Sequence, residues 1–325
     1  MRLLRIYPDD TRFGFVRFRR VTLPLAAILV LLTIILGMTR GLNFGIDFRG
    51  GTLIELQAKS GEANASLLRQ QADAMGFGTV EVQEFGSAGG ISVRFPIQDG
   101  GEEAQGAVVQ QVRAAFSNDY EFRRVETVGP RVSGELVRSG TLGIVLAIGA
   151  VMIYLWFRFE LQLAIGAIIG TLHDIILTVG FFVVTQSEFN MTSIAAILTI
   201  VGYSLNETVV VFDRTRELMR RYKAISVEEL LDLSVNSTMS RTTMTAMTTF
   251  LATLALVIFG GEAIRGFAEV MLFGVVICTY SAIFVSSPVL IYLGLRSKPE
   301  AATQEASEGR SKDQSKDQSK GHVGA

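Results

Sequence analysis

Six long apolar runs set the strongest constraint on what this chain can fold into. Each is about 20 residues or longer, the length that an α-helix needs to cross the roughly 30 Å hydrocarbon core of a bilayer. Hydrophobic residues make up 49% of the chain and charged residues 19%, a balance typical of multi-span membrane proteins. We therefore predict a polytopic α-helical membrane protein. Its predicted spans are 21–39, 139–158, 161–185, 190–212, 241–261 and 266–294.

The first apolar run resembles a signal peptide, because several arginines precede it. No small-x-small cleavage site follows, however, and Thr39 and Arg40 lead directly into GLNFGIDFRGG. We therefore predict an uncleaved signal anchor, with residues 1–20 as an N-terminal tail on the cytoplasmic side.

Arginine and lysine counts predict the orientation in the membrane. Six spans place both termini on one side, and the segments 1–20, 213–240 and 295–325 each carry five or six Arg or Lys residues. The short links on the opposite side contain only Arg265. Since positively charged loops stay in the cytoplasm, both termini are predicted to be cytoplasmic.

Residues 40–138 are then exported, and their pattern predicts a small folded domain. Two helical stretches alternate with strand-like ones in the order βαββαβ, which indicates a ferredoxin-like α+β fold of about 80 residues. That fold does not fix a function by itself. The stretches are TLIELQAK, ANASLLRQQADAMGFG, TVEVQEF, ISVRFPI, EEAQGAVVQQVRAAF and YEFRRVETV.

The remaining segments carry weaker signals. In the 213–240 loop, Ser226 and Glu229 form a capping box that predicts a short amphipathic helix at the membrane surface. Beyond residue 295 the polar repeats of SKDQSKDQSK predict a disordered cytoplasmic tail. The single cysteine, Cys278, excludes an intrachain disulfide and is interpreted as a small core residue. A net charge of −1 gives no sign of nucleic-acid binding.

Polar residues interrupt the third span. Gly166, Gly170, Asp174 and Thr178 recur every four residues, so they share one face of the helix and that face is expected to contact protein. The glycines favour close helix packing. For the adjacent pair His173 and Asp174, buried polar packing and a proton site both remain open. A metal site is not favoured, because the other histidine lies in the tail.

A carboxylate in the fourth span is the most informative of these polar residues. Glu207 follows Thr199 and Tyr203 at four-residue spacing, with Asn206 beside it. It is expected roughly 10 Å in from the cytoplasmic face, at a depth that the side chain of Arg241 matches from the start of the fifth span. The two could form a switchable pair that couples to protons or a static buried ion pair. The polar side of the fifth span continues through Thr245, Thr248 and Thr249, which favours a hydrated path.

Five motifs in order resemble the SecF family, the smaller subunits of the SecDF accessory complex of bacterial protein export, which are related to the RND transporters. The resemblance covers about residues 40–295. It implies six transmembrane helices in the bacterial inner membrane, a small periplasmic ferredoxin-like domain, and a SecD partner that supplies the other half of a pseudo-symmetric bundle. The motifs are NFGIDFRGGT, GTLHDIILTVG, VGYSLNETVVVFDRTRE, SRTTMTAMTTF and GFAEVMLFGVVICTYSAIFVSSPVL, the last with an FGG before it.

The resemblance also implies roles for particular residues. The family usually has Asn-Asp where this chain has Asn206 and Glu207, so the acid implicated in proton coupling with the arginine at position 241 is one methylene longer here. Asp213 and Arg214 match an Asp-Arg motif that we interpret as a structural or capping pair. No chemistry is assigned to the first-loop motif residues, which are Asp47, Arg49, Gly50 and Gly51.

The resulting hypothesis is a transport protein, not an enzyme, that has no cofactor and uses protons as its coupling ion. It would use the proton gradient to help draw an unfolded exported polypeptide away from the SecYEG channel, with YajC and YidC as further candidate partners. Two alternatives stay open: half of an RND-type exporter of small molecules or lipids, and a non-transporting scaffold of the translocase. An intramembrane enzyme is disfavoured, since no serine–histidine pair or second intramembrane aspartate at a protease spacing is present.

Overall fold

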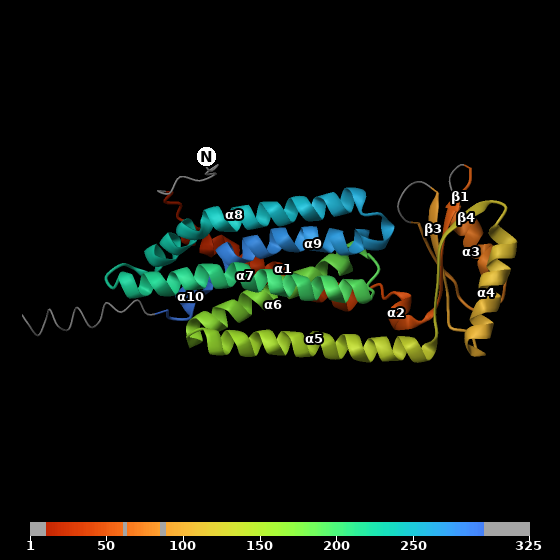
Figure 1. Ribbon diagram of the computed structural model, residues 1–325, viewed down its shortest axis with the longest axis horizontal. Helices are drawn as coiled ribbons and strands as arrows, with labels where there is room; N and C mark the ends of the chain where they lie inside the picture. Colours follow the sequence, from red (N-terminus) through yellow and green to blue (C-terminus); the bar gives the residue numbers. More distant parts are fainter. Residues whose placement is uncertain (1–10, 61–63, 85–88, 296–325) are drawn as a thin grey trace, which may run out of the picture. The chain divides into compact units, whose positions relative to one another are not determined.

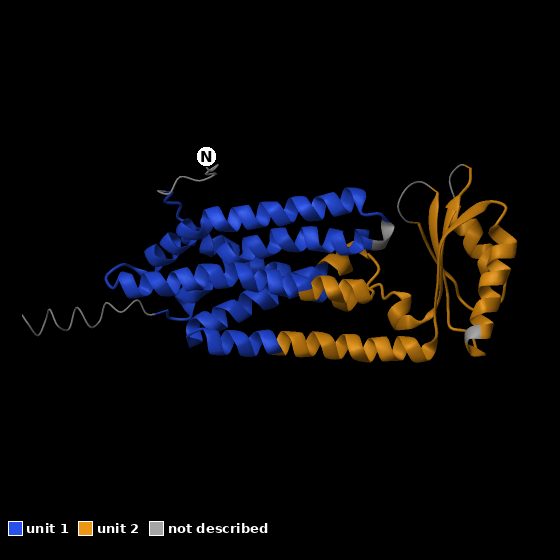
Figure 2. Cartoon of the chain, in the orientation of Figure 1, with its two compact units in different colours: residues 1–36, 150–180, 199–325 blue, residues 37–149, 181–198 orange. Residues whose placement is uncertain are grey.

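The computed structural model describes residues 11–60, 64–84 and 89–295. The chain divides into two compact units (Figure 2): unit 1 comprises residues 1–36, 150–180 and 199–325, and unit 2 comprises residues 37–149 and 181–198. The first ten residues and the predicted disordered tail from residue 296 lie outside the described residues.

Within the described residues, six helices are long and apolar enough to cross a membrane (Figure 1). Together with the small sheet domain described below, they confirm the predicted fold class. A 3₁₀ turn, η1 (Val16–Phe18), precedes the first of them, and the sixth is built from three consecutive pieces. The helices are α1 (Arg19–Arg40), α5 (Pro130–Arg158), α6 (Leu161–Thr185), α7 (Met191–Arg221), α8 (Val227–Phe259) and the run α9 (Glu262–Ser281), η2 (Ala282–Ser286) and α10 (Ser287–Tyr292).

Burial separates these helices into two groups. In the most apolar window of each, 56% of α6, 50% of α7 and 61% of the α9–α10 run are buried, against 6% of α1 and 11% each of α5 and α8. The first group therefore provides the protein interior, and large apolar faces of the second group are left for lipid or for another protein. The interior of unit 1 is filled by side chains such as Leu163, Phe212 and Leu290.

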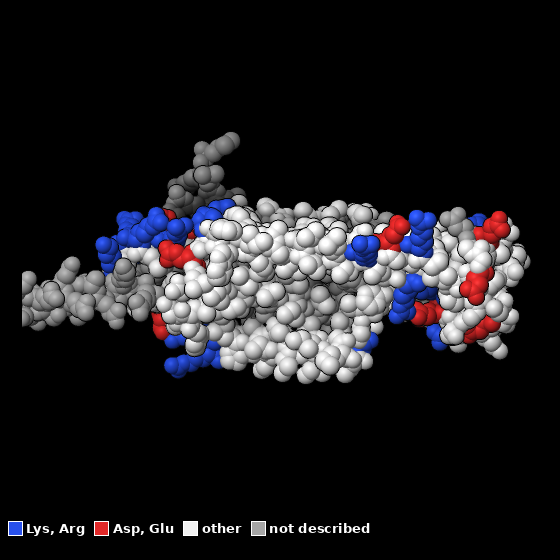
Figure 3. Space-filling model, turned by 90° about the horizontal axis from the view of Figure 1, so that it is seen from below, with Lys and Arg blue, Asp and Glu red and all other residues white. Residues whose placement is uncertain are grey.

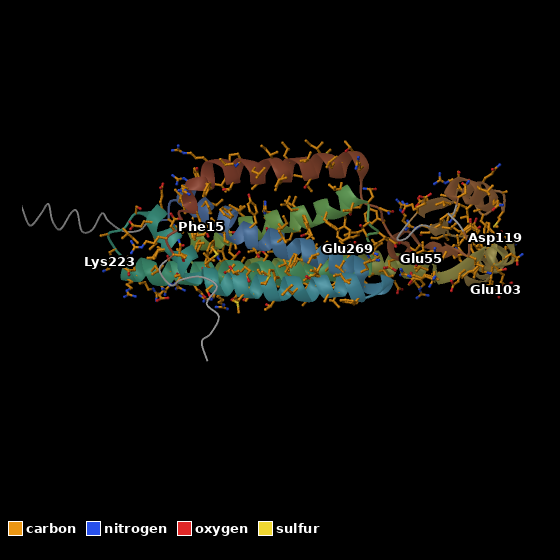
Figure 4. The ribbon with its side chains drawn as sticks, turned by 90° about the horizontal axis from the view of Figure 1, so that it is seen from above. Phe15, Glu55, Glu103, Asp119, Lys223 and Glu269 are labelled. Atoms are coloured by element: carbon orange, nitrogen blue, oxygen red, sulfur yellow. The ribbon has the colours of Figure 1, made fainter. Side chains whose placement is uncertain are left out.

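One face of unit 1 carries its charged residues near the ends of the helices. Figure 3 shows Lys and Arg atoms gathered at the end of unit 1 where α7 and α8 are joined, and a flank of uncharged atoms beyond it. In Figure 4, Lys223 in this connection and Glu269 on α9 are well separated along the direction of the helices of unit 1. An uncharged band bordered by charged residues is the pattern of a chain that spans a bilayer.

The sheet domain in unit 2 has the predicted βαββαβ order. Its four strands, β1 (Gly51–Ala58), β2 (Glu81–Glu84), β3 (Gly90–Phe95) and β4 (Tyr120–Val128), form an antiparallel sheet in the order β2-β3-β1-β4. The helices α3 (Ala65–Asp73) and α4 (Gly101–Phe116) pack on it. Apolar residues of the sheet and both helices, among them Ile54, Leu68 and Val112, form one buried core.

Several helices extend beyond the predicted spans. α5 begins at Pro130, a residue suited to the first helical position, and α7 continues to Arg221. The connection after α7 differs from the predicted separate short helix, because the stretch capped by Ser226 is the start of α8 itself. The Ser226 side chain accepts a hydrogen bond from the Glu229 amide at 3.2 Å, as the sequence predicts. Apolar length measures only the part of a helix in hydrocarbon, whereas the helix itself continues into water.

The sixth spanning helix is interrupted by a π-helical turn, η2. Such turns leave some backbone groups without their α-helical partner and are frequent at functional sites. The hydroxyl of Ser287 donates to the carbonyl of Ala282 at 2.8 Å. This side chain therefore satisfies a backbone acceptor in a place that water does not reach, since Ser287 is fully buried.

Candidate functional site

The polar residues of the third and fourth spans meet inside unit 1. Asp174 on α6 is 1% exposed, and the Ser204 hydroxyl on α7 donates to its Oδ2 at 2.5 Å. On the other side of the carboxylate, His173 Nδ1 lies 3.0 Å from Oδ1. The second ring nitrogen of His173, Nε2, is buried and has no hydrogen-bond partner within the described part of the chain. The carboxylate therefore joins α6 to α7.

Glu207 joins α7 to α8 in the same way. Its side chain is among the buried ones, with a relative exposure of 2%, and the Thr245 hydroxyl donates to its Oε1 at 2.8 Å. Ser204 and Glu207 are three residues apart, so they lie on one face of α7. A line of polar groups thus runs from α6 through α7 to α8, within the apolar part of unit 1.

The predicted ion pair between Glu207 and Arg241 is not formed among the described residues. Arg241 is exposed on α8, and among the ion pairs of residues 11–60, 64–84 and 89–295 none joins it to Glu207. The hydroxyl of Thr245, one helical turn further along α8, contacts the carboxylate instead. Asn206, next to Glu207, is also exposed. Two polar side chains in a spanning region that are open to the outside of this unit indicate a face that another protein covers.

The glycines of the third span contact the sixth. A Cβ on Gly166 would come within 2.6 Å of Leu290 Cδ2, and a Cβ on Gly170 would overlap Ser286 Oγ. One turn further, the Thr178 hydroxyl donates to the carbonyl of Asp174 at 2.7 Å. The stripe therefore faces protein, as the sequence predicts, and its glycines admit the π-helical turn close to α6.

The first-loop motif lies in unit 2, where Ile46–Arg49 forms a short helix, α2. Asp47 Oδ2 accepts a hydrogen bond from the amide of Met191, the first residue of α7, at 2.9 Å. Arg49 forms an ion pair with Glu81 at 2.7 Å. Gly50 and Gly51 have φ angles of 71° and 107°, and a Cβ on Gly51 would lie 2.2 Å from the carbonyl oxygen of Phe95. Glycine is therefore required at position 51 by both conformation and space.

Asp213 and Arg214, which the sequence suggests as a pair, form separate ion pairs. Asp213 Oδ2 lies 2.6 Å from Arg158 at the end of α5. Arg214 pairs with Glu217 at 2.6 Å and donates to the hydroxyl of Ser237 on α8. Both are structural contacts at the charged end of unit 1.

Sequence reasoning missed one member of the polar line, Ser204. The signal was present, since this serine precedes Glu207 by three residues and so lies on the same face of the helix. A serine in a helix often bonds to its own backbone, so its partner could not be assigned before the position of α6 was known.

Comparison with known proteins identifies the family to which this chain is similar. The family model described as protein export membrane protein SecD/SecF, C-terminal, matches residues 108–296, and the SecD/SecF GG motif model matches residues 35–62. The protein translocase subunit SecF of Rickettsia bellii (strain OSU 85-389) is 41% identical over 292 residues, which cover 88% of this chain and 95% of the relative.

Longer relatives match over only part of their length. The protein translocase subunit SecDF of Brucella abortus biovar 1 (strain 9-941) is 41% identical over 297 residues, which cover 91% of this chain and 39% of the relative. The crystal structure of SecDF from Thermus thermophilus, a translocon-associated membrane protein, matches with a TM-score of 0.81 and 30% identity over 90% of this chain and 40% of that chain. This chain thus spans about two fifths of the SecDF proteins and nearly all of the SecF protein.

Proposed function

This chain belongs to the SecD/SecF family of protein export membrane proteins, and from that premise we propose that it is a SecF-type subunit that couples proton movement to protein export. The observation that carries the proposal is Glu207, a buried carboxyl group in a spanning helix that accepts a hydrogen bond from the hydroxyl group of Thr245. Ionisable groups at such depth are costly and mark proton and ion pathways.

The proposed cycle uses Glu207 and Arg241 as a switchable pair. When Glu207 is ionised, it attracts the guanidinium group of Arg241; when it takes up a proton, it releases Arg241 and the helices shift. The arrangement described above fits the released half of the cycle, because Arg241 is exposed and Glu207 accepts from Thr245. In the proposal, the Thr245 hydroxyl keeps the Glu207 carboxyl group in place while Arg241 is released from it.

We assign Asp174 and His173 to a second site for the proton, which is deeper because Asp174 lies about 20 Å along α6 from its start at Leu161. Ser204 connects the two sites, since its hydroxyl touches Asp174 and lies on the same face of α7 as Glu207. A hydroxyl group can donate one hydrogen bond and accept others, so it can pass a proton between acids without becoming charged. We propose that protons reach Glu207 past Asn206, because Asn206 is exposed and is next to Glu207 in the sequence.

The partner of this subunit is proposed to be SecD, in keeping with the SecDF relatives that contain a matching segment within a longer chain. SecD would cover the exposed polar residues Arg241 and Asn206, which have no place in lipid. The SecYEG channel, an unfolded exported polypeptide, YajC and YidC are the further proposed partners. The proposed orientation has both termini in the cytoplasm and residues 40–138 in the periplasm, on the strength of the arginine and lysine counts.

The experiment reconstitutes the complex with SecD and SecYEG in vesicles and measures release of a preprotein with and without a proton gradient. Glu207→Gln keeps an oxygen that accepts from Thr245 but cannot ionise, so stimulation by the gradient should disappear. Arg241→Met should give the same loss, whereas Glu207→Asp keeps a carboxyl group and should retain the stimulation.

Full stimulation in Glu207→Gln would refute proton coupling at this residue. If export then failed only when residues 40–138 were removed, the chain would be a scaffold. Gradient-driven movement of a lipid or small molecule without any effect on the preprotein would instead favour the exporter alternative.

A further inference from the structure

The start of α7 is tied to the segment that follows α1, within unit 2. Phe44 and Phe189 form a parallel β-bridge, with the Gly45 amide donating to the Phe189 carbonyl at 2.8 Å. The Phe189 amide in turn donates to the carbonyl of Asn43, also at 2.8 Å. The rings of Phe44, Phe48 and Phe189 pack together around this bridge. Two segments far apart in sequence thus meet immediately before α2 and α7.

Asp47 continues this connection onto α7 itself. The first four amides of a helix have no partner inside the helix, and in α7 two residues supply acceptors for them. Asn190, directly before the helix, accepts from the Ser193 amide at 3.1 Å, which is an ordinary local cap. Asp47 accepts from the Met191 amide at 2.9 Å although it lies 144 positions away in sequence. Its negative charge also suits the positive end of the helix.

The chain after Asp47 has little freedom to absorb movement. Gly50 and Gly51 adopt left-handed conformations, and Gly51 lies directly against the backbone of Phe95 at the end of β3. Gly51 is also the first residue of β1, which pairs with β3 and β4 in the middle of the sheet. Asp47 is therefore separated from the central strand of the domain by three constrained residues.

Arg94 on β3 contacts both segments that form the bridge between Phe44 and Phe189. Its Nη2 donates to Glu188 Oε1 at 2.9 Å, and its Nη1 donates to the carbonyl of Phe44 at 2.8 Å. The Arg94 side chain is 11% exposed, so these contacts are largely shielded from water. Arg94 thus contacts both partners of the bridge, Phe44 directly and Phe189 through its neighbour Glu188.

From these contacts we infer that Asp47 is a positioning residue that transmits movement of α7 to the sheet domain. α7 is one continuous helix from Met191 past Glu207, a separation of about 24 Å at 1.5 Å per residue. A shift of α7 triggered at Glu207 would move the Met191 amide. The hydrogen bond from this amide would then move Asp47, and Gly50 and Gly51 would pass the movement to β1. The inference rests on the proposed function, because it assigns the output of the proton cycle to this motif.

The alternative is that Asp47 only stabilises the end of α7. The chain offers a matched control, since Asn190→Ala removes a capping hydrogen bond from the same helix end without touching the link to β1. Asp47→Ala removes the link, and Asp47→Asn keeps an oxygen that can accept from the Met191 amide. These three variants and the unmodified protein are compared as full chains in complex with SecD.

Two readouts are measured in reconstituted vesicles: proton flux and the amount of preprotein released per unit of flux. Asp47→Ala should keep the flux and lower the release per unit of flux about tenfold, within the usual range of coupling energies. Asp47→Asn should restore the release, and Asn190→Ala should change neither quantity. Equal losses in Asp47→Ala and Asn190→Ala, or no loss in Asp47→Ala, would overturn the inference.

Amide hydrogen exchange gives a readout that does not depend on transport. Asp47→Ala should speed up exchange in β1 as well as in the first turn of α7, whereas Asn190→Ala should affect only α7. Unchanged exchange in β1 of Asp47→Ala would refute the link even if transport were normal in the unmodified complex. Absence of gradient-driven release in the unmodified complex, with the β1 effect present, would instead refute the proposed function and leave the mechanical link established.

Discussion

Asp174 and Glu207 each accept a hydrogen bond from a hydroxyl group on a neighbouring helix, Ser204 and Thr245 respectively. Unlike a lysine or an arginine, a hydroxyl group can stay in contact with a carboxyl group in both of its protonation states. The interior of unit 1 is therefore suited to a carboxyl group that changes charge without losing its position.

Ser204→Ala should lower stability, because it removes a donor from a carboxyl group that is almost fully buried. The expected loss in free energy of unfolding is about 1–3 kcal/mol, measured by equilibrium unfolding in mixed micelles. Ser234→Ala is the matched control: Ser234 is equally buried, but its hydroxyl bonds to the Leu230 carbonyl of its own helix. That substitution should cost less than Ser204→Ala, because a serine hydroxyl that bonds to the carbonyl four residues earlier in its own helix adds little to stability. Equal losses in the two variants would show that Ser204 does not support Asp174.

Periodicity in the sequence predicts which residues share a helix face, and it correctly places Gly166, Gly170 and Asp174 toward protein. It does not predict which face of α7 meets α6 and which meets α8. The sequence suggests Arg241 as the contact of Glu207 because the two match in depth, whereas the Thr245 hydroxyl contacts Glu207 in the structure. In the proposed cycle the relation between Glu207 and Arg241 changes with the protonation of Glu207, and a single chain's sequence does not encode such a change.

At the scale of helices, the packing of α6 against the sixth span depends on Gly170. A Cβ at this position would overlap Ser286 Oγ, so Gly170→Ala should destabilise the protein by about 1–3 kcal/mol even though alanine favours helices. Combining it with Ser286→Ala should recover part of the loss. The measurement is again unfolding in mixed micelles.

Gly149→Ala on α5 provides the control for this prediction, because a Cβ there would meet no atom within 4 Å. It should leave stability unchanged or raise it slightly. If Gly170→Ala were as harmless as Gly149→Ala, α6 and η2 would not be in close contact in the membrane.

The sequence predicts the number and order of the spanning helices and the βαββαβ domain, since both follow from hydrophobic periodicity. It does not predict the π-helical turn at Ala282–Ser286 or the full lengths of α7 and α8. A π-helical turn depends on the space left by Gly170 on another helix. Likewise, the capping of α7 by Asp47 joins positions that no local pattern connects.

At the scale of the whole molecule, the proposed orientation can be tested by labelling single cysteines. The one native cysteine, Cys278, is 1% exposed and is first replaced by alanine. A membrane-impermeant maleimide should label Ser117→Cys, after α4, in cells whose outer membrane has been made permeable. Lys223→Cys, between α7 and α8, should react only after the inner membrane is opened. The reverse pattern would contradict the orientation derived from arginine and lysine counts.

The central claim is that Glu207 takes up and releases a proton, and infrared difference spectroscopy of the complex with SecD tests it most directly. Spectra recorded as the pH is stepped should contain a protonated-carboxyl C=O band that appears and disappears with pH. The contribution of Glu207 to this band should be missing in Glu207→Gln and shifted but present in Glu207→Asp. Identical difference spectra for the unmodified complex and Glu207→Gln would show that this carboxyl group does not change its protonation, and would contradict the account.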